Sequence, residues 1–466
     1  VNSSGLVETV ELLGSEEVID GSFANDLDDW TTYGTTSAAS GIATIGATSN
    51  SGIYQDALTN GLTYSVTINV TSYDGVGSAQ VANNNGNVIY TITTTGIQTF
   101  TFTHSIASGN LLIRGLSNAL FSLTNVSVKE STKNNLARVD YDGTASSLLV
   151  EPERKNEVTY SEDLSVLQKV SIGTASAPVT TSNYAIAPDG TQTATRVVFN
   201  LNGGTSIGDR SILRQAIPMG SNYYFSIYVK STDGTEQKVM WHDGGEFNLT
   251  TVTNEWVRIT YDANVGISYA GIALKGGQGV DSSDILTWGF QVETGSYATS
   301  YIPTDGSTVT RVADQYSKTG ISNLINSEEG VLFVEMAYLN NTGNYKSLSI
   351  SDGTTDNRVT FENRPVLNQI KAFVNVSGTN VMSSTQTLTD VKEFNKMALK
   401  WKQNDFAWWV NGVEIYTDTS GNTFSEDTLN RLAFDRGDGF IQLEGKIKQL
   451  QVFKTALTDT ELATLT

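Results

Sequence analysis

The chain has 466 residues, of which 17% are charged, and its 29 basic and 49 acidic residues give a net charge of −20. Such a surface repels phosphate backbones and anionic lipids, so we expect neither nucleic-acid binding nor membrane insertion. The absence of cysteine excludes disulfides, thiolate-bound zinc and thiol nucleophiles.

The composition also bears on where the protein is found. No apolar stretch of about 18 residues could span a membrane, and no signal peptide is visible, although the start at Val1 fits a processed product. A cysteine-free chain rich in Thr, Ser, Asn and Gly fits a particle protein that is assembled in a reducing bacterial cytoplasm and later exposed outside.

At roughly 150 residues per domain, the length predicts about three domains. Residues 1–17 form an acidic arm, and residues 18–130 contain strand-like runs separated by Gly, Asn and Asp turns. This spacing predicts an antiparallel β-sandwich. Residues 131–155 are interpreted as a connector that contains the first proline of the chain.

A second β-sandwich is predicted at 156–312, because the sequence pattern of one strand of the first sandwich recurs there. Segment 64–75 and segment 223–234 both alternate apolar with mostly polar residues before an Asp-Gly turn. The core-facing residues of the two copies are predicted to be Tyr64, Val66, Ile68 and Val70, matched by Tyr223, Phe225, Ile227 and Val229. The closing strands also correspond, with Val126 and Val128 matched by Phe290 and Val292.

Residues 313–466 form a third pattern, again of short alternating runs, which predicts a third β-sandwich. Near its end, Thr458 is followed three residues later by Glu461, a capping box that predicts a short helix. The fold class is therefore all-β, with three antiparallel sandwiches of jelly-roll type in tandem.

Several segments resemble a module of structural proteins from tailed bacteriophages. They are Leu149-Val-Glu-Pro-Glu-Arg-Lys-Asn156, Tyr160-Ser-Glu-Asp163, Ala187-Pro-Asp-Gly-Thr191, and the run from Gln291 to Thr304 followed by Arg311. The first sandwich resembles carbohydrate-binding jelly rolls, and the third, with Trp409-Val-Asn-Gly412, resembles laminin-G or concanavalin-like domains. The resemblance implies a fibre or adhesin component on the virion surface.

Sugar binding by a sandwich requires aromatic rings on an open sheet face, together with amide or carboxylate groups. In the second sandwich the outer face of the repeated strand carries Tyr224 and Tyr228, where the first has Ser65 and Asn69. The predicted glycan-binding residues are Tyr224, Tyr228, Trp241, His242 and Trp409.

Jelly rolls of these kinds often hold structural calcium through oxygen ligands. Asp20 and Asp26 lie in an acidic stretch at the start of the first sandwich, and Asp435 and Asp438 flank a turn in the third. These four are the candidate metal ligands, and solvated turns are the alternative interpretation.

No catalytic residue is predicted. The chain has only two histidines, of which His104 is interpreted as a surface residue and His242 lies in a richer polar context. No pair of carboxylates stands out by its spacing as a glycosidase pair.

The sequence thus predicts a non-enzymatic bacteriophage virion protein, in a fibre or on the capsid, that binds host-surface polysaccharide. Its other expected partners are virion proteins and further copies of itself, with a trimer as one possibility. The alternatives are a purely structural decoration protein, and the non-catalytic modules of a secreted polysaccharide-degrading enzyme.

Overall fold

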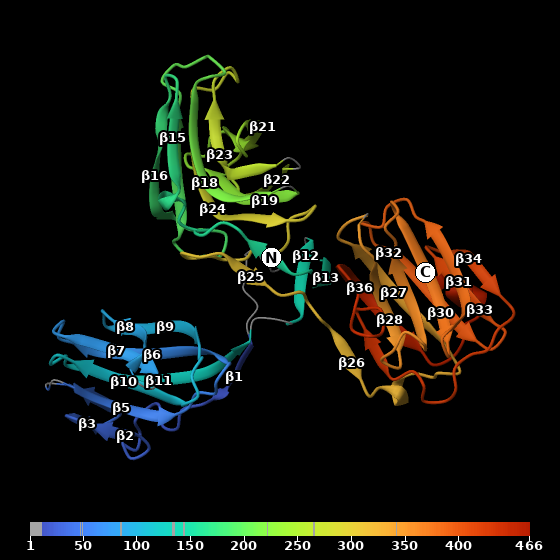
Figure 1. Cartoon of the computed structure of the whole chain (residues 1–466), viewed down its shortest axis with the longest axis horizontal. Helices are drawn as coiled ribbons and strands as arrows, with labels where there is room; N and C mark the ends of the chain where they lie inside the picture. Colours follow the sequence, from blue (N-terminus) through green and yellow to red (C-terminus); the bar gives the residue numbers. More distant parts are fainter. Residues whose placement is uncertain are drawn as a thin grey trace. The chain divides into compact units, whose positions relative to one another are not determined.

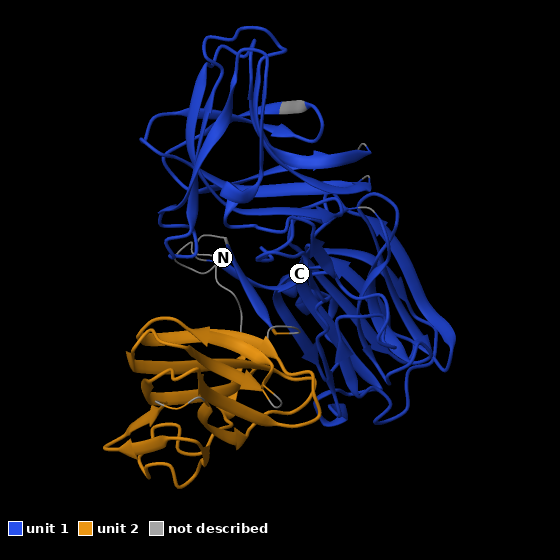
Figure 2. Ribbon diagram, turned by 60° about the vertical axis from the view of Figure 1, so that its left-hand side comes forward, with its two compact units in different colours: residues 1–8, 137–466 blue, residues 9–136 orange. Residues whose placement is uncertain are grey.

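The computed structural model shows a chain built almost wholly of antiparallel strands (Figure 1). It describes residues 12–46, 48, 50–83, 86–132, 136–142, 145–220, 222–263, 266–341 and 343–466. The chain divides into two compact units, Thr9–Leu136 and a second unit that contains Ala137–Thr466 (Figure 2). The predicted all-β class is confirmed, and no helix among the described residues has the length and hydropathy needed to cross a membrane.

The first unit is a sandwich of two sheets. One sheet has the order β3-β4-β11-β6-β9 with β1 also paired to β11, and its strands are β1 (Leu12–Glu16), β3 (Thr36–Ala39), β4 (Ile42–Ile45), β6 (Thr63–Tyr73), β9 (Gly96–Thr103) and β11 (Phe121–Thr132). The other has the order β2-β5-β10-β7-β8, with β2 (Thr31–Tyr33), β5 (Asn50–Asp56), β7 (Ser78–Asn83), β8 (Val88–Ile92) and β10 (Asn110–Leu116). Part of the predicted arm is therefore a strand of the first sheet, and residues 1–11 lie outside the described residues.

Apart from β1, the second sandwich repeats this topology strand for strand. One sheet runs β16-β17-β24-β19-β22, with β16 (Ser176–Ala185), β17 (Ala194–Asn200), β19 (Tyr223–Ser231), β22 (Val257–Ala263) and β24 (Ser282–Thr294). The other runs β15-β18-β23-β20-β21, with β15 (Gln168–Ile172), β18 (Arg210–Gly220), β20 (Gln237–His242), β21 (Glu246–Val252) and β23 (Ile267–Lys275). A 3-10 turn, η2 (Leu164–Val166), precedes β15. Because β2 to β11 and β15 to β24 agree in chain order and in sheet order, the predicted duplication is confirmed.

The two copies of the repeated strand, β6 and β19, face their cores as predicted. All eight predicted core residues are buried inside their own sandwich. The pairing with the closing strand is also repeated, since Val66 lies opposite Val128 and Phe225 lies opposite Val292. Alternation along a strand therefore determined the inner face in both copies.

The third sandwich also has two sheets. One runs β12-β13-β36-β27-β32-β33-β34, with β12 (Arg138–Asp142), β13 (Ala145–Val150), β27 (Glu329–Tyr338), β32 (Asn395–Lys402), β33 (Phe406–Val410), β34 (Val413–Asp418) and β36 (Gly445–Phe453). The other runs β26-β35-β28-β29-β30-β31, with β26 (Ser317–Thr319), β28 (Lys346–Ser351), β29 (Arg358–Asn363), β30 (Gln369–Val376), β31 (Thr379–Thr387) and β35 (Arg431–Ala433). A 3-10 turn, η3 (Ser322–Leu324), and the helix α1 (Asp459–Leu465) complete it, and α1 begins with the predicted capping box of Thr458 and Glu461.

The segment interpreted as a connector is largely a strand hairpin, and this differs from the sequence interpretation. Strands β12 and β13 extend a sheet of the third sandwich through pairing of β13 with β36, next to which Figure 1 shows them. The second sandwich is thus inserted between β13 and the rest of the third. Its entry strand β14 (Arg154–Asn156) pairs with its exit strand β25 (Val309–Arg311).

Candidate functional site

The outer face of β19 is covered by the chain itself, so the predicted open aromatic platform is not formed. Tyr228 is 9% exposed and packs against Trp288, with ring centroids 5.6 Å apart. Tyr301, from the segment after β24, lies 4.5 Å from the Trp288 ring. Tyr224 is only half-buried on the same face. Alternation placed these side chains on the outer face correctly, but it carries no information about which segment covers that face.

The other two candidates of this sandwich are buried. Trp241 is 1% exposed in the core, where it stacks on Tyr261 and contacts Phe225 edge to face. His242 is 2% exposed, and its Nε2 lies 3.4 Å from Nη1 of Arg214. Neither side chain is available as a sugar platform in this structure.

His104, interpreted as a surface residue, is fully buried. One ring nitrogen, Nε2, lies 2.9 Å from the carbonyl oxygen of Ser108. The histidine therefore anchors the loop between β9 and β10, and the surface interpretation is wrong.

Trp409, predicted as a glycan-binding residue, is covered by the C-terminal helix. It lies on the face of β33 opposite to Phe406 and Trp408, as the alternation predicts, and it is 8% exposed. Leu462 of α1 is fully buried in the same cluster. The helix was predicted, but its packing on this sheet face was not.

The four candidate metal ligands serve in turns and ion pairs. Asp20 accepts from the backbone amides of Ala24 and Asn25, and Asp26 lies exposed in the same turn. Asp435 pairs with Arg431 and Asp438 with Arg436. Within the described part of the chain, no three Asp, Glu or His side chains gather to hold a metal ion. Calcium binding stays a prediction.

The segments that resemble phage modules meet in a buried polar network of the second sandwich. The Asn156 amide donates to the carbonyl oxygens of Phe290 and Ile302, and its Oδ1 accepts from the amide of Val292. Glu293, fully buried, accepts from the backbone amide and the hydroxyl of Thr299 at 2.8 and 2.6 Å. These bonds fold residues 295–304 back over the sheet, so the motif has a structural role.

Ion pairs continue this network to the third sandwich. Glu151 pairs with Arg311 at 3.0 Å and with Arg138 at 3.3 Å, and Arg138 also pairs with Asp314. Each of these carboxylates is almost fully buried, so the two arginines compensate charges that water cannot reach. The strand connection between the two sandwiches is thereby fixed by charge as well as by backbone pairing.

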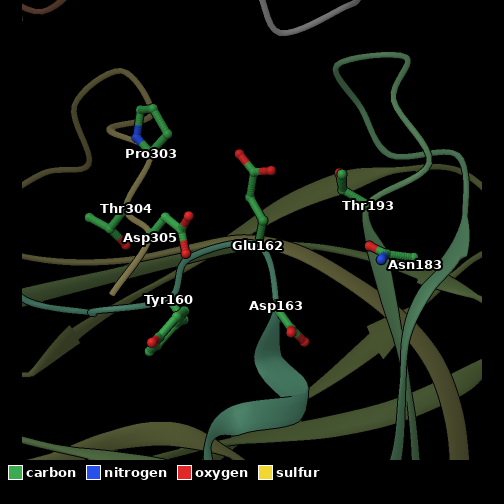
Figure 3. Close-up of a pocket in the computed structure, with 8 residues that line it drawn as sticks. All are labelled: Tyr160, Glu162, Asp163, Asn183, Thr193, Pro303, Thr304 and Asp305. Carbon is green, nitrogen blue, oxygen red and sulfur yellow. The ribbon is translucent and has the colours of Figure 1, made fainter. Parts of the chain in front are cut away.

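A cavity of about 490 Å³ opens beside the covered face of the second sandwich (Figure 3). Its lining residues come from the segment before η2, from β16 and the loop after it, and from the segment after β24. They are Tyr160, Glu162, Asp163, Asn183, Thr193, Pro303, Thr304 and Asp305. Figure 3 shows Glu162 standing between Thr304–Asp305 on one side and Asn183 with Thr193 on the other. This is our candidate functional site.

Hydrogen bonds hold the cavity walls in place. Tyr160 bridges Asp305 through the backbone. Thr193 Oγ1 accepts from the Trp288 indole at 3.0 Å, which joins the cavity to the aromatic cluster below it. The Tyr301 hydroxyl lies 2.6 Å from Ser161 Oγ and donates to Glu162 Oε1 at 3.1 Å. Hydrogen bonds therefore tie the cavity walls to the aromatic cluster and to one another.

The residues that line the cavity carry a net negative charge. Burial raises the pKa of Glu162, the Tyr301 hydroxyl bond opposes this, and the charges of Asp189 and Asp305 raise the pKa again. Among the eight described residues that line the cavity, none is basic. The arrangement can accept hydrogen bonds from hydroxyl or amine groups, and it repels anions.

A smaller cavity of about 310 Å³ lies in the third sandwich, lined by Asn326, Glu328, Glu329, Lys402, Gln403 and Thr423. Its Lys402 is paired with Glu329 at 2.9 Å. With this ion pair already formed, fewer of its polar groups are open to a ligand, so we place the candidate site in the second sandwich.

Two of the segments that resemble phage modules, Tyr160–Asp163 and the run that ends at Thr304, supply lining residues of the main cavity, but no site was predicted there. The available signal was the turn-forming runs Ser161-Glu-Asp163 and Ile302-Pro-Thr-Asp305, which contain lining residues, and Pro188-Asp-Gly-Thr191, which lies between the lining residues Asn183 and Thr193. They are more than 100 residues apart at the extremes, and only the fold of β17, β19 and β24 brings them together.

Comparisons with known proteins do not place the chain in a family. No protein-family model matches it, and no curated protein matches it. Among solved structures it is similar to the Ruminococcus gnavus IT-sialidase CBM40 bound to α2,3-sialyllactose, at 18% identity, covering 32% of this chain and 98% of that one, with a TM-score of 0.26. The tandem CBM22-1–CBM22-2 domain of Paenibacillus barcinonensis Xyn10C covers 62% of this chain and 99% of its own, at 14% identity and a TM-score of 0.26.

A SAP-like pentraxin from Limulus polyphemus overlaps 30% of this chain and 70% of its own, at 13% identity and a TM-score of 0.25. At these scores we draw no functional conclusion from any of the overlaps.

Proposed function

We propose that the chain is a non-enzymatic binding protein that holds a hydroxyl-rich glycan in the Glu162 cavity. The lining carries the proposal: carboxylates, an amide and hydroxyls surround an open space large enough for a sugar. Sugar hydroxyls donate to carboxylate and amide oxygens.

The test is a glycan array probed with the whole chain, alongside binding to host cells. Glu162→Gln replaces a charged acceptor by a neutral amide and Asn183→Ala removes an amide from the cavity, so each should weaken binding. Glu328→Gln, in the smaller cavity, is the matched control and should bind as the unaltered chain does. Binding that survives both cavity variants would contradict the proposal.

The finer part of the proposal is that the ligand is host-surface polysaccharide and that the chain stands on the surface of a tailed-bacteriophage particle, with other virion proteins and further copies of itself. The resemblance of residues 149–156 and 291–304 to phage modules supports this. Immunogold electron microscopy of intact particles tests it, and labelling of a fibre or of the capsid is expected.

Two alternatives predict different results. A purely structural decoration protein would label particles but bind no glycan. A module of a secreted polysaccharide-degrading enzyme would be found in culture fluid together with activity that releases reducing sugars.

A further inference from the structure

Lys346, the first residue of β28, has a buried amine that lies next to an amide and a carboxylate. The side chain is 2% exposed and lies on the same side of the strand as the core residues Leu348 and Ile350. Its Nζ lies 2.9 Å from Oδ1 of Asn340 and 3.6 Å from Oε2 of Glu444. A lysine, an asparagine and a glutamate therefore meet at one point, in a chain that has no cysteine for a disulfide.

Other contacts hold these three side chains within reach of one another. The backbone amide of Leu339 donates to the carbonyl oxygen of Glu444, which places the glutamate beside Asn340. The hydroxyl of Tyr297 donates to Oε2 of Glu444 at 2.7 Å and so orients the carboxylate. Groups that are already in contact react without the entropic cost of being brought together.

The surroundings of the lysine amine favour its neutral form. Burial lowers the pKa of Lys346, the carboxylate of Glu444 opposes this, and the positive charge of Arg154 lowers the pKa further. A lysine amine that is desolvated in this way is a nucleophile, whereas a solvated ammonium is not. Glu444 is close enough to accept the proton that the ammonium gives up.

We propose that Lys346 and Asn340 form an intramolecular amide bond, which is a covalent crosslink between the loop after β27 and the start of β28. Nζ attacks Cγ of Asn340 after Glu444 has taken a proton from the ammonium, and the bond from Cγ to Nδ2 breaks. Of the three ammonium protons, one stays in the new amide and two leave through Glu444 with the former amide nitrogen, as an ammonium ion. Atoms and charge therefore balance, and the step requires no oxidant, reductant or other reactant.

The crosslink would close residues 340–346 into a covalent ring. Residues 343–345 of this ring are exposed, so the bond protects a surface loop from opening. It would also restrict the unfolded chain, as a disulfide does in proteins that contain cysteine. The proposal concerns the third sandwich alone and is independent of glycan binding in the second.

A second asparagine lies opposite Lys346, across the pair of strands β28 and β29. Asn363 is fully buried, and neither polar atom of its amide has a hydrogen-bond partner among the described residues. Asn340 is the favoured acceptor because its Oδ1 is already hydrogen-bonded to the amine. The two acceptors give different peptides on digestion, so an experiment distinguishes them.

The test is the intact mass of the whole denatured chain by mass spectrometry. We expect a mass lower than that of the sequence by one molecule of ammonia. Trypsin should then fail to cleave after Lys346 and should release residues 319–358 as one peptide that carries the loss. Fragmentation of this peptide should locate the loss between residues 340 and 346.

Three variants assign the chemistry to these residues. Lys346→Met lacks the amine and Glu444→Gln lacks the group that takes the proton, so both should have the full mass of their sequences. Lys402→Met is the control, because this exposed lysine pairs with Glu329 and should leave the loss of ammonia unchanged.

A full sequence mass in the unaltered chain would overturn the proposal, and this result does not depend on whether any variant folds. A loss of ammonia with normal cleavage after Lys346, or one that persists in Lys346→Met, would overturn it as well. A crosslinked peptide that joins Lys346 to residues 359–364 would overturn Asn340 as the acceptor. Retention of the loss in Glu444→Gln would overturn the role of Glu444.

Discussion

The outer faces of β6 and β19 occupy equivalent positions in the first and second sandwiches, but one carries a polar pair and the other an aromatic pair. Matching of the repeated strands places Asn69 and Thr124 where the second sandwich has Tyr228 and Trp288. In the first sandwich the Asn69 amide donates to Thr124 Oγ1 at 2.9 Å. In the second, the two aromatic rings pack together.

The loops that surround these patches differ as well. Between β3 and β4 the first sandwich turns through Ser40 and Gly41, both with positive φ, whereas residues 186–193 connect β16 to β17. After β24 the chain returns over the sheet as residues 295–304, held by Glu293. The core determines the topology, and these loops determine whether the outer face becomes a covered surface with a cavity beside it.

Of the substitutions that test this comparison, Trp288→Ala should lower the free energy of unfolding most. The indole is 1% exposed, so its removal leaves a large void between β24 and the Tyr301 segment, and we expect a loss of about 4 kcal/mol in the free energy of unfolding. Thr124→Ala, at the equivalent position, should cost about 1 kcal/mol because only one hydrogen bond is lost. Urea unfolding with hydrogen exchange read separately for the two units measures both, and equal losses would refute the comparison.

Glu293→Gln should release the covering segment. It removes a buried charge that Arg154 faces at 3.6 Å and places an amide donor near Thr299, at an expected cost of about 3 kcal/mol. The equivalent residue of the first sandwich is Lys129, and Lys129→Gln should change stability by less than about 0.5 kcal/mol. Faster amide exchange in residues 295–304 of the Glu293 variant is the diagnostic result; unchanged exchange there would speak against the role assigned to Glu293.

A smaller effect is expected at Ser226, which matches Thr67. Ser226 is 1% exposed and accepts from Arg258 Nη2 at 2.8 Å, so Ser226→Ala leaves a donor unpaired and should cost about 1 to 2 kcal/mol. Thr67 instead shares an exposed hydroxyl pair with Thr99, and Thr67→Val should be close to neutral. Thermal unfolding of the two variants decides this; a larger loss for Thr67→Val would contradict it.

The smallest effect concerns pH. The pKa of Glu162 in the folded chain is raised, by burial first and by Asp189 and Asp305 as well, so stability falls as pH rises from the unfolded pKa through the folded one. Glu162→Gln keeps the acceptor for Tyr301 but does not ionise. It should therefore unfold at a higher temperature than the unaltered chain at pH 7, with the difference vanishing near pH 4. A difference that is the same at both pH values would argue against this titration.

The sequence was sufficient where a pattern acts over neighbouring residues. The inner faces of β6 and β19, the split between Trp408 and Trp409, and the capping box at Thr458 follow from alternation and local hydrogen bonding, and all are observed. The sequence did not show which segments cover the outer sheet faces. Tyr228 is buried against Tyr301 and Trp409 against Leu462, and each partner lies more than 50 residues further along the chain.

The same limit explains the errors in segment 131–155 and at the candidate site. Strand β13 pairs with β36 across about 300 residues, and no periodicity in either segment specifies such a partner. Glu162, Asn183 and Asp305 are ordinary turn and strand residues in sequence, and they become a site only when their segments converge.

The inserted position of the second sandwich has a mechanical consequence. Its entry and exit strands, β14 and β25, are paired with each other, and the backbone amide of Asp314 donates to the carbonyl oxygen of Glu151 just outside them. If the chain were pulled between residue 137 and its C-terminal end, the force would pass through the hydrogen bonds between β13 and β36. The second sandwich, inserted after β13, would lie outside this path and would not be stretched. The Glu162 cavity would therefore keep its geometry, and a ligand bound in it would be retained, while the third sandwich bears the force.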